Sequence, residues 1–202
     1  MIILDFLKKF EHNPVFSIAD VLRLYPGFDR KNLVRWQEKG LVLKLRNKWY
    51  ALPEKIRDEA DLFMVANAIY VPSYVSLESA FAFYGWIPEG VFTVTSVTTL
   101  KTAFFSNETG HFQYTNIKKS LFFGFWFPGN LRMAEPEKAL LDYLYLHPEL
   151  VSVEDFESLR WFREEISEKI NFQKLLDYAR LFDSAVLNRR ISIFKQFLDG
   201  EY

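Results

Sequence analysis

The chain has 202 residues, of which half are hydrophobic and 18% are aromatic. That much apolar side chain excludes an intrinsically disordered protein and allows either one domain or two unequal ones. The absence of cysteine excludes a disulfide framework, a thiolate metal site and a cysteine nucleophile.

The charges are unevenly distributed. Residues 1–27 carry three basic and three acidic side chains, whereas residues 28–48 carry seven basic side chains against two acidic ones, a net charge of +5. Because the whole chain has a net charge of −1, residues 49–202 carry −6. A short basic segment in an otherwise acidic chain predicts a local contact with a polyanion.

Two apolar stretches fail the requirements for membrane targeting. The first ten residues already contain Asp5, Lys8 and Lys9, so they lack the apolar run of a signal peptide. The aromatic run Leu121–Phe127 is far shorter than the ~20 residues that a spanning helix needs. The chain is therefore expected to be soluble and cytoplasmic, without a membrane partner.

Two helices are predicted in the first 25 residues. The first rests on apolar residues at helical spacing, namely Ile2, Ile3, Phe6, Leu7 and Phe10. For the second, Ser17 is a suitable N-cap, and Asp20 follows three residues later as in a capping box.

A third helix and a β-hairpin follow. Asp29 is expected to cap a helix that runs to about Lys39, with Gly40 as its left-handed C-terminal residue. The β-rich runs 41–45 and 48–52 flank the polar pair Arg46-Asn47 and predict a hairpin. Three short helices before a hairpin are typical of a winged helix-turn-helix, which we assign to residues 1–55.

In a winged helix the third helix enters the major groove of DNA and the hairpin lies over the backbone. A helical wheel places Leu33, Val34 and Trp36 on the core side and a mostly cationic face opposite, with Glu38 on it. Arginine and asparagine there can pair bidentately with guanine and adenine. Arg30 and the hairpin cations suit phosphates. The predicted DNA-binding residues are Arg30, Lys31, Asn32, Arg35, Lys39, Lys44, Arg46 and Lys48.

The rest of the chain predicts an α+β domain over residues 70–202, joined by a linker at about 56–69 in a region that contains a charged, helix-like stretch around 54–68. Ser76 can cap a helix that Gly85 closes. Strands are expected at 91–97, 111–117, 121–127 and 131–133. Helices are expected after Pro136 and at 154–168, 172–182 and 185–198. Helices gathered behind a small antiparallel or mixed sheet give the fold class α+β.

The sequence contains no recognisable catalytic set. Its three histidines are far apart and lack partners at metal-ligand spacing. The most suggestive carboxylates are Glu135, Glu137 and Asp142, but the first two flank a proline at a helix start, where the helix dipole favours negative charge. No cofactor or metal is expected, and the protein is not predicted to be an enzyme. The basic residues of the last helix, Arg189, Arg190 and Lys195, are expected to keep that helix soluble.

Taken together, several strings resemble the AbiEi family, the antitoxin and repressor component of type IV toxin–antitoxin (abortive infection) systems. They are Phe16–Val21, Gly40-Leu41, Lys48–Tyr50, Tyr74–Ala80, Gly85 and Ala134–Asp142, and the Pro-Glu-Lys-Ala-Leu-Leu-Asp part of the last is the most specific. The wing departs from the family pattern, because Lys48-Trp49 stands where a glycine commonly precedes the tyrosine.

The resemblance implies a phage-defence regulator that binds inverted repeats of double-stranded DNA in its own promoter. It also implies a functional partner, a nucleotidyltransferase-like toxin, that is neutralised without a stable complex. Two alternatives stay open. The winged helix could be a protein-interaction module without DNA binding. The chain could also be a nucleotidyltransferase-like enzyme, although it lacks a Gly-Ser followed by paired aspartates.

Overall fold

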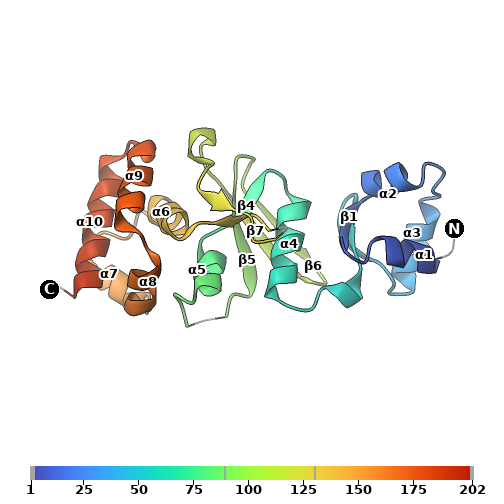
Figure 1. Cartoon of the computed structure of the whole chain (residues 1–202), viewed down its shortest axis with the longest axis horizontal. Helices are drawn as coiled ribbons and strands as arrows, with labels where there is room; N and C mark the ends of the chain where they lie inside the picture. Colours follow the sequence, from blue (N-terminus) through green and yellow to red (C-terminus); the bar gives the residue numbers. More distant parts are fainter. Residues whose placement is uncertain (1–2, 89, 130, 201–202) are drawn as a thin grey trace. The chain divides into compact units, whose positions relative to one another are not determined.

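The computed structural model describes residues 3–88, 90–129 and 131–200. It divides into two compact units (Figure 1). The first comprises residues 1–71 together with 104–112, and the second comprises residues 72–103 and 113–202. The mixed α+β class predicted from the sequence is confirmed.

The first unit combines short helices with a three-stranded antiparallel sheet of order β1-β3-β2. The sheet brings residues 15–17 and 43–46 to either side of the strand at 49–51. The elements, in chain order, are α1 (Ile3–Lys9), β1 (Val15–Ser17), α2 (Ile18–Leu24), α3 (Lys31–Glu38), β2 (Leu43–Arg46), β3 (Trp49–Ala51), η1 (Pro53–Lys55) and α4 (Glu59–Ile69).

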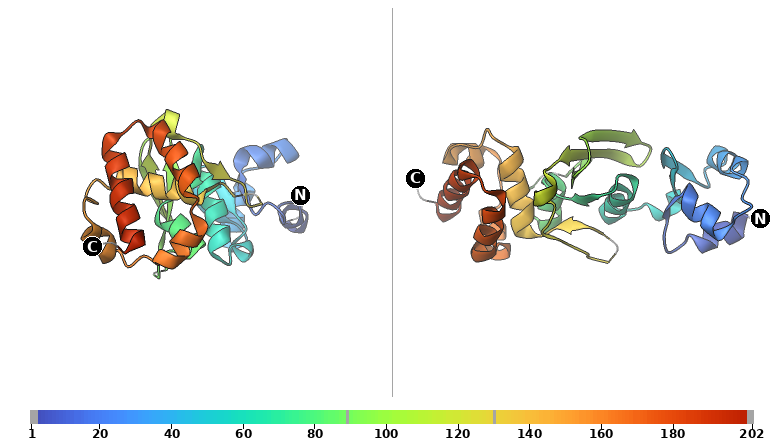
Figure 2. Two further views of the ribbon diagram at one scale, coloured as in Figure 1. Left: turned by 60° about the vertical axis from the view of Figure 1, so that its left-hand side comes forward. Right: turned by 90° about the horizontal axis from the view of Figure 1, so that it is seen from above.

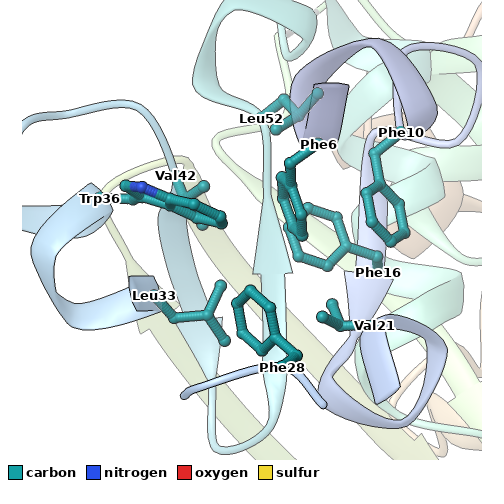
Figure 3. Packing of buried hydrophobic residues seen from close by; sticks show 9 residues of the cluster. All are labelled: Phe6, Phe10, Phe16, Val21, Phe28, Leu33, Trp36, Val42 and Leu52. Carbon is teal, nitrogen blue, oxygen red and sulfur yellow. The ribbon is translucent and has the colours of Figure 1, made fainter. Parts of the chain in front are cut away.

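An aromatic core holds these elements together. Phe6 lies at its centre, with ring centroids 4.7 Å from Trp36 and 4.8 Å from Phe10 (Figure 3). Each fully buried side chain of this size stabilises the fold by about 1.5–3 kcal/mol relative to exposure. The nine buried residues of the cluster are Phe6, Phe10, Phe16, Val21, Phe28, Leu33, Trp36, Val42 and Leu52.

The local helix signals of the first unit are confirmed. The Ser17 side chain accepts a hydrogen bond from the backbone nitrogen of Asp20, and the Asp20 carboxylate accepts one from the Ser17 backbone nitrogen. Gly40 has a φ of +68°, the left-handed conformation expected after α3. Of the first helix, residue Ile2 lies outside the described part of the chain.

Three expectations for this unit need correction. Val34 was expected in the core but is 55% exposed, because at 100° per residue it points well away from both Leu33 and Trp36, which form the buried stripe. The hairpin turn is at Asn47-Lys48 rather than one residue earlier, since Arg46 still pairs with Trp49 across the sheet. The helix-like stretch expected at 54–68 is the helix α4, but its Phe63, Val65 and Ile69 are buried and it belongs to the first unit, so the segment 56–69 is not a linker.

The larger sheet has six strands in the order β6-β7-β5-β4-β9-β8. It is mixed, because β4 pairs antiparallel with β5 and parallel with β9. The outer part of the β6–β7 hairpin, residues 104–112, belongs to the first unit. The strands are β4 (Ser73–Val75), β5 (Thr93–Thr98), β6 (Ala103–Asn107), β7 (Gly110–Asn116), β8 (Phe125–Trp126) and β9 (Met133–Ala134).

The helices of the second unit gather behind this sheet. In Figures 1 and 2, α6 lies between the strands and the C-terminal helices, and α9 and α10 run side by side. These helices are α5 (Glu78–Tyr84), α6 (Pro136–Leu146), α7 (Val153–Ser158), α8 (Arg163–Lys169), α9 (Phe172–Phe182) and α10 (Ala185–Asp199), with a 3-10 turn η2 at Lys119–Leu121.

Several details of the second unit differ from expectation. The run 121–127 contains only the two-residue strand β8, since Gly124 takes a φ of +67° in its middle. The helix expected at 154–168 is two helices, because the chain turns at Arg160, whose φ is +54°. Arg190, expected on a soluble face, is buried and donates hydrogen bonds to the carbonyls of Leu144 and Pro148 at 2.9 and 3.2 Å.

Candidate nucleic-acid interface

Helix α3 is fixed by its two ends and by one apolar stripe. The Asp29 carboxylate accepts a hydrogen bond from the backbone nitrogen of Lys31 at 3.0 Å, although the N-cap position itself is Arg30 rather than Asp29 as the sequence predicts. Leu33 and Trp36 are buried on the inner face. The Leu41 nitrogen donates to the Trp36 carbonyl at 2.9 Å just after Gly40. These contacts determine which face of α3 points outward.

The outward face carries the cations that the sequence assigned to it. Lys31, Arg35 and Lys39 are exposed, Asn32 is half-buried, and Arg30 is exposed in the turn before the helix. Glu38 and Val34 are also exposed on this face. The face is therefore cationic but contains one carboxylate and one apolar side chain.

The β2–β3 hairpin contributes two further exposed cations, Lys44 and Lys48. Lys48 occupies the turn with a φ of +68°, a conformation that costs an ordinary residue about 1–2 kcal/mol. Its carbonyl accepts a hydrogen bond from the backbone nitrogen of Ile18 at 2.9 Å. The turn is thereby tied to the first residue of α2, beside the Ser17–Asp20 capping box.

Arg46 differs from the other predicted site residues. Its guanidinium donates to the carbonyl of Ile69 at 2.6 Å. It also lies over the rings of Phe105 and Tyr70, 4.4 and 5.6 Å from their centroids. Arg46 thus connects β2 to the end of α4 and to residues 104–112 of the same unit, and it does not project from the hairpin tip. Ile69 is 23 residues away from Arg46 in the sequence and Phe105 is still further. The local sequence pattern around Arg46 therefore does not indicate these contacts.

The six other predicted cations are free of carboxylate partners. Within the described part of the chain, no acidic side chain lies within ion-pair distance of Arg30, Lys31, Arg35, Lys39, Lys44 or Lys48. Elsewhere in the same unit Arg23 pairs with Asp20 at 2.7 Å and Lys55 with Glu11 at 3.1 Å. Lys8 and Lys9 on α1 and Arg57 are also exposed and outside these ion pairs. Among the described residues of this unit, most of the unpaired positive charge therefore lies on α3, the turn before it and the hairpin.

The three carboxylate residues noted in the sequence have two different structural roles, one for Glu135 and Glu137 and another for Asp142. Glu135 accepts a hydrogen bond from the Tyr178 hydroxyl at 2.6 Å, and Glu137 accepts one from the Asn171 backbone nitrogen at 2.9 Å. Lys174 lies 3.2 Å from a carboxylate oxygen of each. These two side chains therefore attach the start of α6 to α9.

Asp142 belongs to a separate, fully buried cluster. Its carboxylate accepts hydrogen bonds from the Tyr74 hydroxyl at 2.8 Å and the Ser76 hydroxyl at 2.9 Å, and it forms an ion pair with Lys138. Burial raises the pKa of Asp142 and lowers the pKa of Lys138. Because the Ser76 hydroxyl donates to Asp142, it does not cap α5 as the sequence predicts, and α5 begins without a side-chain cap.

Two searches of the described residues bear on other functions. In the ranges 3–88, 90–129 and 131–200, no group of three His, Asp or Glu side chains is arranged to hold a metal ion. No helix within those ranges is long and apolar enough to cross a membrane.

Comparison of the sequence with protein-family models and with curated proteins gives no match.

Proposed function

We propose that the first unit contains a winged helix-turn-helix that binds double-stranded DNA, and that the protein is a cytoplasmic transcriptional regulator without catalytic activity. The order of α1, β1, α2, α3 and the β2–β3 hairpin supports this assignment. In a winged helix the second and third helices form the helix-turn-helix, and the hairpin is the wing.

The observation that carries the proposal is the exposed, unpaired positive charge on α3 and the hairpin. An exposed cation without a carboxylate partner can neutralise a phosphate of the DNA backbone, and the release of the counterions condensed there drives DNA binding. Lys31, Arg35 and Lys39 lie on one face of one helix. Lys44 and Lys48 lie on the hairpin of the same unit. A phosphate backbone is the polyanion that such a pair of elements fits.

The residues divide into three roles in the proposed complex. Arg35 and Asn32 are the base-reading candidates, since their side chains match guanine and adenine edges. Lys31 and Lys39 flank them and bring positive charge to the groove. Arg30, Lys44 and Lys48 bind phosphates, where position matters more than the identity of the base. Arg46 has a structural role and is left out of this set.

The second part of the proposal is an antitoxin role of the type IV kind. Two strings that carry the resemblance to the AbiEi family meet in the Asp142 cluster: Tyr74 and Ser76 come from one, Lys138 and Asp142 from the other. Tyr74 and Ser76 precede Asp142 by 68 and 66 positions, yet both donate hydrogen bonds to its carboxylate. This contact supports the view that the two strings belong to one family pattern. The proposed partner is a nucleotidyltransferase-like toxin, counteracted without a stable complex, and the proposed operator contains inverted repeats.

The direct test is a mobility-shift titration of the purified full chain against the DNA upstream of its own gene, repeated from 50 to 200 mM salt. We expect binding that weakens steeply with salt, because each neutralised phosphate contributes about −0.9 to the slope of log affinity against log salt. Retention of a protein partner that is insensitive to salt, with no DNA shift at any salt concentration, would contradict the proposal and favour a protein-interaction module.

A further inference from the structure

Val34 has an environment unlike that of the other apolar residues of α3. Leu33 and Trp36 are 2% and 8% exposed, whereas Val34 is 55% exposed. Lys31 precedes it by three residues and Glu38 follows it by four, and both are exposed. Residues at these spacings are neighbours on a helix surface, with Cβ atoms about 5–6 Å apart. Val34 is therefore an apolar spot within the cationic face.

The fold of the first unit does not require a valine at this position. Val34 is absent from the buried cluster and from the residues that pack against it. A β-branched residue also has lower helix propensity than alanine, because its χ1 rotation is restricted in a helix. The same restriction holds its two methyl groups in one direction, which suits a contact surface.

We propose that Val34 reads thymine, through contact between its methyl groups and the C5-methyl group of that base in the major groove. This inference rests on the proposed function, since it assumes that α3 enters the groove. The thymine methyl is the one apolar feature of the base edges there, and apolar side chains are its usual partners. Val34 complements Arg35 and Asn32, which suit the polar edges of guanine and adenine. The reading face thus offers a chemical partner for three of the four bases.

The test compares thymine with uracil, which lacks only the C5-methyl group. The wild-type full chain first selects a binding site from a pool of random duplexes. That duplex is then synthesised with thymine throughout, and in a series of variants that each carry uracil in place of one thymine. Affinity is measured by fluorescence anisotropy at 100 mM salt. For wild type we expect at least one position where uracil weakens binding about fourfold, the factor that corresponds to one buried methyl group.

Substitutions of Val34 test whether this residue causes the difference between thymine and uracil. Val34→Ala should bind the thymine site more weakly and lose the difference between thymine and uracil. Val34→Ile, which keeps the methyl groups, should retain the difference. Leu4→Ala is the matched control, because Leu4 is 70% exposed on α1, and it should behave as wild type. Thermal melts confirm that each variant is folded.

The outcomes separate this inference from the proposal on which it rests. If the pool yields no bound DNA even at 50 mM salt, both are overturned. If DNA binds but no thymine position distinguishes uracil, or if Val34→Ala keeps the full difference, the thymine contact alone is overturned.

Discussion

The guanidinium of Arg46 lies over the ring of Phe105, 4.4 Å from its centroid. Phe105 belongs to the β6–β7 hairpin, whose residue Asn107 also donates a hydrogen bond to the Leu45 carbonyl at 3.1 Å. Two adjacent residues of β2 are thus bound to one distant hairpin within the first unit. This relationship separates Arg46 from the cations proposed to bind DNA.

Replacing Arg46 should therefore affect stability and leave the electrostatics of DNA binding unchanged. Arg46→Met keeps the apolar stem but loses the hydrogen bond to Ile69 and the contact with Phe105. We expect the first unit to lose about 1–3 kcal/mol, since a charged hydrogen bond is removed and a partly buried carbonyl is left unpaired. Urea unfolding followed by tryptophan fluorescence measures the loss. A shallower salt dependence of DNA binding by the folded variant would show that Arg46 contacts phosphate after all.

The wing lysines should show the opposite behaviour. Lys44→Ala should reduce the slope of log affinity against log salt by about 1, as expected for one lost phosphate contact, with little change in stability. Lys48→Gly should reduce the slope equally. It should also raise the free energy of unfolding by about 1 kcal/mol, because glycine relieves the positive φ. Unchanged slopes for both variants would remove the hairpin from the interface.

The local signals in the sequence are sufficient for the helices of the first unit and for the cations on the outward face of α3, but not for the break between α7 and α8. The Ser17–Asp20 box, Asp29, Gly40 and Gly85 each act within a few residues of the chain, so their effect can be predicted without knowing the fold. Strand β1 was missed because its three residues are strands only by pairing with 49–51. The exposure of Val34, in contrast, follows from its angle on α3 relative to Leu33 and Trp36, so the expectation that placed it in the core is wrong.

In the second unit, the sequence also fails to indicate hydrogen-bond partners that lie far away along the chain. Ser76 has a sequence context typical of a helix cap, yet its hydroxyl donates to Asp142, 66 residues away. Arg190 lies in a helix with polar neighbours, yet it is buried against the carbonyls of Leu144, in the last turn of α6, and Pro148, just after it. In both cases the side chain forms its hydrogen bonds with a group that is distant in the sequence rather than taking the role that its neighbours suggest. No local pattern specifies that distant group.

The Lys138–Asp142 pair offers a test of how the second unit is stabilised. Lys138→Met or Asp142→Asn alone should each destabilise the unit by about 3–5 kcal/mol, since one buried charge loses its partner. The double variant should cost less than the sum of the two, with a coupling of about 0.5–3 kcal/mol. Lys119→Met, at an exposed lysine, is the control and should have little effect. Strict additivity in the urea unfolding cycle would contradict the pairing.

Tyr84 should make the second unit sensitive to alkali. Its hydroxyl donates to the Ala134 carbonyl at 2.6 Å and accepts from the Trp126 ring nitrogen at 3.1 Å. Burial raises the pKa of Tyr84 from 10.0 to about 12. The folded state therefore favours the neutral phenol, so the stability that this group contributes is complete below pH 10 and is lost as the pH rises toward 12. Phenolate absorbance during an alkaline titration monitors this ionisation.

Tyr84→Phe provides the comparison for that titration. It should lower the free energy of unfolding at neutral pH by about 1 kcal/mol, the usual contribution of one hydrogen bond. It should also remove one ionisation near pH 12 and flatten the loss of stability between pH 10 and 12. If the ionisation that disappears is centred near pH 10 instead, the Tyr84 hydroxyl is not protected in the folded protein.

The proposed DNA binding depends most on the outward cations of α3, and removal of two of these charges tests their role. Lys31→Ala/Arg35→Ala removes two positive charges from that face, and Lys8→Ala/Lys9→Ala removes two exposed ones from α1. Affinity for the upstream DNA is measured for both variants and wild type by fluorescence anisotropy at 100 mM salt. We expect the α3 variant to lose about thirtyfold or more in affinity, as for two groove contacts of about 1–3 kcal/mol each, and the α1 variant to change little. An α3 variant that binds as tightly as wild type would contradict the central claim.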